Sequence, residues 1–282
     1  MSRYEIRPMG EEELHAMVDS AAAEGWNPGL HDAGPFYAQD PEGFLCGCLD
    51  GRPVAWISAV RYGDEFGFIG FYMVLPEYRH SGYGIPLSDA ATARLKGIRV
   101  GIDGVFERQE DYHARYGYEF AYRNIRFELK RPENLQTGGN VEEAAAVPFA
   151  ELAAFDRRHF PAPREAFLRP WLQMPDSHSL VVRDGGEILG YGTIRPCRQG
   201  WKIGPLFANN AGTGEDLFCA LLARVPVGDP VYLDVPEPNE AGMAMAGRYG
   251  MQQVFGTARM YTGGIPDLPL DRIFGVTTFE LG

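Results

Sequence analysis

The chain contains no apolar run long enough to span a membrane, and its first residues, MSRYEIRPMGEEELHAM, lack the apolar core of a secretory signal. We therefore expect a cytoplasmic protein. Cysteine is scarce, and the four present, Cys46, Cys48, Cys197 and Cys219, suggest no disulfide framework. Cys46-Gly-Cys48 has neither the spacing nor the second pair of a zinc site, and it is interpreted as two small side chains on one strand face.

Metal-ligand spacing is also missing among the histidines, so we expect no metal. Four of them are interpreted as surface or loop residues: His15, His80, His159 and His178. Positive charge is in deficit as well, because the formal net charge is −12. This balance argues against a nucleic-acid partner and is compatible with a cationic acceptor. The 282 residues are enough for two domains, each with its own core.

The most informative stretch runs from Phe66 to Leu87, FGFIGFYMVLPEYRHSGYGIPL. Its first ten residues are almost continuously apolar, which predicts a central strand covered on both faces. Pro76 ends that strand. Two glycines, Gly82 and Gly84, then let the backbone N–H groups turn inward at the start of a helix, where they favour a phosphate. An ordinary strand-turn-helix connection is the alternative.

Arg-x-x-Gly-x-Gly after a strand that ends in Val-Leu-Pro resembles the coenzyme A pyrophosphate loop of the GNAT superfamily of N-acetyltransferases. The flanking pattern agrees with this resemblance. The sequence predicts an edge strand at Tyr4–Pro8, a helix at 11–23, a hairpin of 44–49 with 53–62, the central strand, a helix at 85–96 and a strand at 98–106. A short helix at 109–116 follows, and 118–130 is expected to complete the sheet as two extended pieces.

A loop rich in Gly and Pro, residues 25–37, interrupts the first half. It carries Trp26, Asn27, His31 and Asp32, which we interpret as acceptor-site candidates. The alternative is a lid over the core that is anchored by Trp26 and Phe36.

The second half repeats this outline after a turn-rich linker. We expect helices at 142–158 and 164–173, a hairpin over 180–195, a central strand at 201–208, a helix at 213–225, a strand at 231–235 and a helix at 239–249. The turn before the helix at 213–225 could hold an anion through its backbone N–H groups, or Thr213 could cap that helix. Arg115-Tyr116-Gly117 precedes Arg126 as Arg248-Tyr249-Gly250 precedes Arg259, and Asp103 and Asp234 end the preceding strands. A diverged internal duplication explains these matches.

The whole layout resembles the bacterial tandem GNAT proteins, whose second acetyltransferase domain is degenerate. It implies an α+β (α/β/α) fold with two mixed, mostly antiparallel twisted sheets flanked by helices. The expected domains are 1–131, which binds acetyl-CoA, a linker at 132–140, and a degenerate unit at 141–282. The turn 209–214 of the second half has no arginine, so we expect the cofactor in the first half.

The resemblance also implies a set of cofactor contacts. Backbone groups of one strand would pair with the pantetheine arm and the N–H groups of the loop would hold the pyrophosphate: Tyr72, Met73, Val74 and Leu75, then Arg79, His80, Ser81, Gly82, Tyr83 and Gly84. A backbone N–H near Met73 or Val74 would stabilise the oxyanion.

In the GNAT superfamily that the chain resembles, the acid that protonates the departing thiolate is commonly a tyrosine four residues before the glycine of a Gly-aromatic pair. Here His113 stands four residues before Gly117, with Tyr112 beside it, so either is a candidate acid. The base that deprotonates the amine could be Asp32, Glu65 or His31, and no spacing selects one. Ala246, at the corresponding place in the second half, cannot act as an acid.

We therefore expect an N-acetyltransferase that moves acetyl from acetyl-CoA to an amine of a small molecule, as a monomer or homodimer. Three alternatives remain open: acetylation of a protein amine, an acyl-CoA-binding regulator without turnover, and a scaffold whose glycine turn binds nothing.

Overall fold

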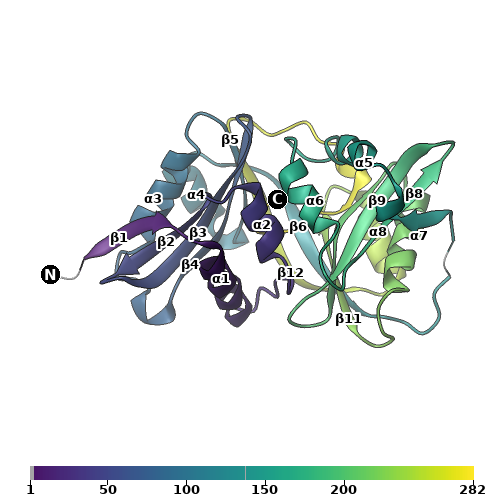
Figure 1. Cartoon of the computed structure of the whole chain (residues 1–282), viewed down its shortest axis with the longest axis horizontal. Coiled ribbons are helices and arrows are strands. Elements are labelled where there is room, and N and C mark those ends of the chain that lie inside the picture. Colours follow the sequence, from purple (N-terminus) through teal and green to yellow (C-terminus); the bar gives the residue numbers. More distant parts are fainter. Residues whose placement is uncertain (1–2, 137) are drawn as a thin grey trace.

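The computed structural model describes residues 3–136 and 138–282; Met1, Ser2 and residue 137, which falls within the expected linker, lie outside the described residues. One twisted sheet runs through the whole chain in the order β1-β2-β3-β4-β5-β12-β6-β11-β10-β9-β8-β7, with β13 attached to β10 (Figure 1). Its strands are β1 (Tyr4–Pro8), β2 (Phe44–Leu49), β3 (Arg52–Tyr62), β4 (Phe66–Val74), β5 (Arg99–Gly104), β6 (Glu119–Lys130), β7 (Val141–Glu143), β8 (His178–Asp184), β9 (Glu187–Pro196), β10 (Trp201–Ala208), β11 (Pro230–Pro236), β12 (Gln252–Thr262) and β13 (Ile273–Gly275).

In the first half, alternation along β3 separates two cores. Trp56 and Val60 face α1 (Glu11–Ala23) and α2 (Ala33–Gln39), whereas Ala55 and Ile57 face α3 (Gly84–Arg94) and α4 (Gln109–Tyr116). A strand whose two faces are both covered needs apolar residues at nearly every position, as β3 and β4 have. The central strand and the three expected helices of this half, α1, α3 and α4, are confirmed, and α1 has its expected bounds.

The halves exchange their last long strands. β12, from the second half, pairs with β5, and β6, from the first half, pairs with β11, while β6 and β12 pair with each other at the centre of the sheet (Figure 1). The prediction for residues 118–130 was therefore wrong in two respects: they form one strand, and that strand lies beside strands of the second half. Local sequence patterns fix a strand but not its partner.

Two buried ion pairs accompany this exchange. Arg126 on β6 pairs with Asp234 on β11 at 2.7 Å, and Arg259 on β12 pairs with Asp103 on β5 at 2.6 Å. These are the arginines and aspartates that recur in the two halves of the sequence. Each arginine reaches the aspartate of the other half.

The second half contains α5 (Phe149–Asp156), α6 (Glu165–Trp171), α7 (Ala211–Leu222) and α8 (Glu240–Arg248). The helix expected at 142–158 was wrong at its start, because β7 and a 3-10 turn (Ala144–Ala146) precede Pro148 and α5 follows it. The expected cap was also wrong: the Asn210 side chain accepts the Thr213 N–H at 3.0 Å and caps α7. α6 packs against α2 of the first half through stacked rings, with Phe36 and Trp171 centroids 6.2 Å apart.

The loop that precedes α2 lies between the halves. The Lys202 ammonium donates to the Asn27 carbonyl at 2.8 Å, and Arg126 donates to the Trp26 carbonyl at 3.1 Å. The predicted loop was too long, because α2 begins at Ala33 despite Gly34 and Pro35. Pro35 lies in the first turn of that helix. Backbone N–H groups in this turn make no hydrogen bond within the helix, so the proline removes none.

His159 also departs from expectation. It is buried, with its ring stacked on Phe207 at 4.8 Å, and its Nδ1 lies 2.9 Å from the Phe155 carbonyl. His178 likewise is the first residue of β8 rather than a loop residue. No helix in the described part of the chain is long and apolar enough to cross a membrane.

Candidate active site

The candidate site begins where β4 and β5 diverge. These parallel strands pair only from Phe66↔Arg99 to Ile69↔Ile102. Beyond Gly70, β4 remains paired with β3 but bulges, and Phe71 takes a left-handed conformation with φ of 49°. No strand therefore pairs with the edge of residues 72–75 that faces β5, which leaves room for an added strand there, although the Val74 carbonyl on this edge accepts from the Arg79 side chain. We refer to this opening as the β4–β5 gap.

The glycine-rich loop, residues 79–84, follows β4 and leads into α3, and we refer to it as the phosphate loop. His80 (φ 62°) and Gly82 (φ 89°) both adopt left-handed conformations, which turns the backbone amides toward one side at the start of α3. Within residues 3–136, the amides of Arg79 and Ser81 reach the carbonyls of Pro76 and Tyr78 at 3.3 and 3.4 Å, and those of His80, Gly82 and Tyr83 have no protein acceptor. Free amides at a helix N-terminus form an anion-binding site.

The Arg79 side chain points away from that anion site. Its Nε donates to the Val74 carbonyl at 2.9 Å, and its guanidinium pairs with Glu24 at the end of α1. Arg79 therefore ties the loop to the end of β4. A pocket of about 190 Å³ lies beside this pair, between the end of α1 and the strands, with Trp56 and Met73 in its wall.

Of the two candidate acids, Tyr112 lies nearer the gap. Its ring packs against Gly104, the last residue of β5, and its hydroxyl lies at the backbone of Val105. Burial raises the pKa of Tyr112, so the phenol keeps its proton at neutral pH. His113 is exposed, and its Nδ1 lies 2.9 Å from the Tyr118 carbonyl on the far side of the helix end.

The corresponding gap of the second half is filled by the protein itself. β10 and β11 pair in parallel only over residues 201–203 with 231–233 and then diverge. β13 enters this space, pairing with β10 at Leu206↔Gly275, and the Val276 amide donates to the Asp234 carbonyl of β11 at 2.9 Å. An internal strand thus occupies the place that is open in the first half.

Sequence comparisons bear on both halves. Residues 11–116 match a model described as acetyltransferase (GNAT) family, and residues 152–275 match one described as acetyltransferase (GNAT) domain. Over 276 residues the chain is 32% identical to the holothin acyltransferase of Pseudoalteromonas sp. (strain SANK 73390), which covers 98% of this chain and 94% of that protein. The chain belongs to the GNAT acyltransferase family. It is therefore an enzyme with two GNAT units in tandem, of a family that uses acyl-CoA.

Solved structures agree on the fold of this GNAT chain. A putative acetyltransferase from Pyrococcus horikoshii superimposes with a TM-score of 0.83 at 20% identity, over 99% of this chain and 96% of that one. A tandem GNAT protein from the clavulanic acid biosynthesis pathway gives a TM-score of 0.65 at 14% identity, over 94% of this chain and 100% of that one. At such low sequence identities these matches show only the fold, which is α+β with two units in tandem.

The acceptor and base candidates occupy different places in the GNAT fold. Trp26 lies over the β4 bulge, its ring 6.4 Å from that of Phe71. Asn27 and Asp32 hold the loop in place: Asn27 bonds the backbone of Gln199, and Asp32 is buried against Arg195 at 2.7 Å. His31 lies 3.8 Å from Asp176.

Glu65 stands at the turn before β4, six residues and roughly 20 Å of extended strand from Phe71. Its carboxylate is exposed and lies 3.5 Å from Arg157 of the second half. The structure therefore does not bring the three base candidates together at the gap.

Sequence reasoning missed the residues that the second half brings to the site. Phe255 of β12 and Phe279 lie with ring centroids 6.2 Å apart, beside Arg126. Residues 276–282 are buried, and a Cβ at Gly70 would collide with the Glu280 carbonyl oxygen. The recurrence of Arg126 and Arg259 was the available signal, but only the strand exchange shows where they lie.

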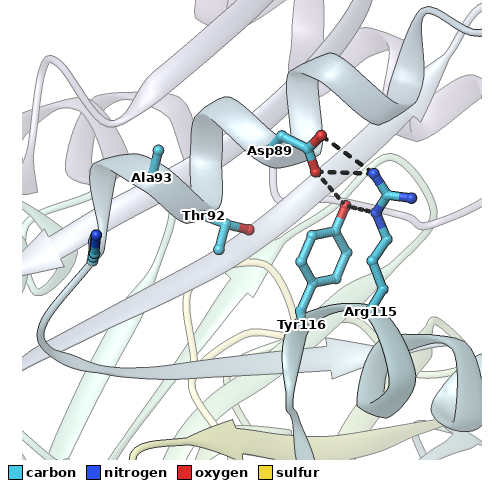
Figure 2. Close-up of a pocket in the computed structure, with 6 residues that line it drawn as sticks. Asp89, Thr92, Ala93, Arg115 and Tyr116 are labelled. Carbon is cyan, nitrogen blue, oxygen red and sulfur yellow. Dashed lines mark hydrogen bonds and ion pairs between the residues drawn. The ribbon is translucent and has the colours of Figure 1, made fainter.

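A second, shallower pocket of about 470 Å³ lies on the opposite face, between α3 and α4. Figure 2 shows Asp89 of α3 directed toward Arg115 and Tyr116 of α4. The Arg115 guanidinium and the Tyr116 hydroxyl each donate to the Asp89 carboxylate at 3.2 Å. These bonds fix α4, and with it Tyr112, against α3.

Proposed function

We propose that the protein transfers acetyl from acetyl-CoA to an amine of a small molecule, and that the donor binds in the first half. The observation that carries this proposal is the contrast between the two gaps: the β4–β5 gap is open, and its counterpart holds β13. β13 also illustrates how a pantetheine arm would lie in the first half, as an added strand along the edge of residues 72–75 that has no strand partner. The name of the holothin acyltransferase supports a small-molecule acceptor.

In the proposed mechanism the amine nitrogen attacks the thioester carbonyl carbon, and the carbon–sulfur bond then breaks. A backbone N–H near Met73 or Val74 would stabilise the oxyanion. Tyr112 donates its proton to the departing thiolate, because its hydroxyl lies at the end of β5 and burial favours its protonated form. The proton released by the amine goes to solvent or to a base not assigned by spacing.

Calorimetric titration of acetyl-CoA tests the location of the donor. Gly82→Trp places an indole in the mouth of the phosphate loop, where no neighbouring atom lies within 4 Å of a Cβ. Because Gly82 has a positive φ, this substitution also strains the backbone. Gly186→Trp is the matched control: it too has a positive φ, of 92°, and open space around it, but it lies in the β8–β9 turn.

The expected result is one acetyl-CoA bound per chain by the wild type and by Gly186→Trp, with binding lost in Gly82→Trp. Two donors per chain, or unchanged binding in Gly82→Trp, would contradict this location. Turnover itself is then tested by screening amines with acetyl-CoA and measuring the release of free coenzyme A thiol.

A further inference from the structure

The mouth of the β4–β5 gap has a wall that comes from the second half. β12 runs antiparallel to β5, and Ala258↔Gly104 is their last pair, so residues 252–257 continue past the end of β5. The Thr257 hydroxyl donates to the buried Asp103 carboxylate at 3.1 Å, so the Thr257 side chain points to the α1–α2 face of the sheet, where Arg259, which also binds Asp103, lies over Phe68. The phosphate loop begins α3 on the opposite face, which leaves the α1–α2 face for the acceptor.

Two aromatic rings on that face lie over the Arg126 guanidinium, and a second pair of rings is linked to it through the Trp26 backbone. Arg126 lies 4.6 Å from the centre of the Phe279 ring and 6.0 Å from that of Phe255, and it bonds the carbonyl of Trp26. Trp26 in turn stacks on Phe71 at the bulge. Phe279 is buried, whereas Phe255 leaves 46% of its surface exposed. An aromatic ring so exposed beside a reaction centre is available to a ligand.

The charges beneath these rings are balanced. Arg126 is paired with Asp234 and Arg195 with Asp32, and the buried Lys202 donates to Asn27. The remaining carboxylate, Glu280, acts electrostatically on all three cations. Three cations thus face three carboxylates, and the wall offers no excess negative charge to attract a polycation.

We propose that the acceptor is an amine carried on a flat aromatic ring, which packs against Phe255 while its amine enters the β4–β5 gap. This inference rests on the proposed function and names its acceptor class. Ring packing against Phe255 and Trp26 supplies the binding energy, and the balanced charges disfavour polyamines and lysine-rich peptides.

The test compares benzylamine with cyclohexylmethylamine, which differ only in the aromaticity of the ring, and with spermidine as a polycation. Initial rates with acetyl-CoA are measured for the wild type, Phe255→Ala and Phe120→Ala. Phe120 is a matched control because it is also a half-exposed phenylalanine, at 44%, but packs on Phe106 away from Phe279.

For the wild type we expect kcat/KM to be highest for benzylamine. In Phe255→Ala the KM for benzylamine should rise about 10-fold, the order of one lost aromatic contact, with kcat and acetyl-CoA affinity unchanged. Phe120→Ala should leave KM unchanged. Equal use of the two ring amines, a preference for spermidine, or an unchanged KM in Phe255→Ala would overturn this inference and leave the proposed transferase standing. Absence of acetyl-CoA binding would instead overturn the proposed function and this inference with it.

Discussion

Arg126 and Asp234 join the two halves of the molecule through two hydrogen bonds of 2.7 Å, from Nε and Nη2 to the two carboxylate oxygens. Both side chains are almost completely buried, with 7% and 2% of their surface exposed. A guanidinium at this depth needs its carboxylate, since it cannot lose its charge. The same arrangement recurs in reverse between Arg259 and Asp103.

Asp234→Asn should therefore destabilise the protein strongly. It leaves Arg126 buried without a counter-charge, and we expect a loss of about 3–5 kcal/mol in the free energy of unfolding. Urea unfolding measures this change. Glu143→Gln is the control, because its 2.6 Å pair with Arg224 is exposed and should contribute about 0.5 kcal/mol. Similar losses in the two variants would contradict this account.

Gly70→Ala should disturb the β4 bulge. Its Cβ would meet the backbone carbonyl of Glu280, which cannot rotate away, so we expect a loss of about 1–3 kcal/mol in stability. Gly247→Ala, the same substitution in α8 with nothing within 4 Å, should raise stability by up to about 1 kcal/mol. Thermal unfolding of both variants distinguishes the collision from a general effect of removing glycine.

Tyr112→Phe tests the proposed acid. Loss of the hydroxyl should lower kcat by about 100-fold, the lower range for a general acid, without changing acetyl-CoA affinity. His113→Gln should retain activity, because its ring faces the Tyr118 carbonyl. A kcat for Tyr112→Phe equal to that of the wild type would remove Tyr112 from the mechanism, and a loss confined to His113→Gln would assign the role to that residue.

His159 should make stability depend on pH. Burial lowers the pKa of His159 from 6.5 to about 4, so between these values the unfolded chain binds a proton that the folded chain does not. The contribution is fully present above pH 6.5 and is lost as the pH falls toward 4, amounting to about 3 kcal/mol. His159→Phe keeps a ring against Phe207. In this variant the urea concentration at half-unfolding should change less between pH 7 and pH 5 than it does in the wild type. If the urea midpoint of His159→Phe depended on pH as strongly as that of the wild type, His159 would not be the cause.

The sequence was sufficient for elements whose signals are local. The apolar run at Phe66, the Asp-Gly turn at Asp50 and the glycine that ends α4 at Gly117 each specify structure within a few residues. The glycine-rich loop at 79–84 was predicted in the same way, from two glycines and an arginine after a strand, and its binding of phosphate stays a prediction.

The partners of β6 and β12 could not be read from the sequence, because two nearly equivalent strands can each complete either sheet with the same alternation of residues. The wall that we propose for the acceptor depends on this pairing, so Phe255 and Phe279 could not be placed from the sequence. The matching arginines showed that the halves are related, but not that each arginine serves the other half.

The exchange of β6 and β12 carries a consequence for the history of the chain. Two copies of a half-length ancestor that swapped their final strands would form this sheet as a symmetric dimer, with the two-fold axis between β6 and β12. After fusion of the two genes, one copy could lose its donor site, and in our proposal this copy is the half whose gap β13 fills. That half would still be retained, because the first half cannot complete its own sheet without β12.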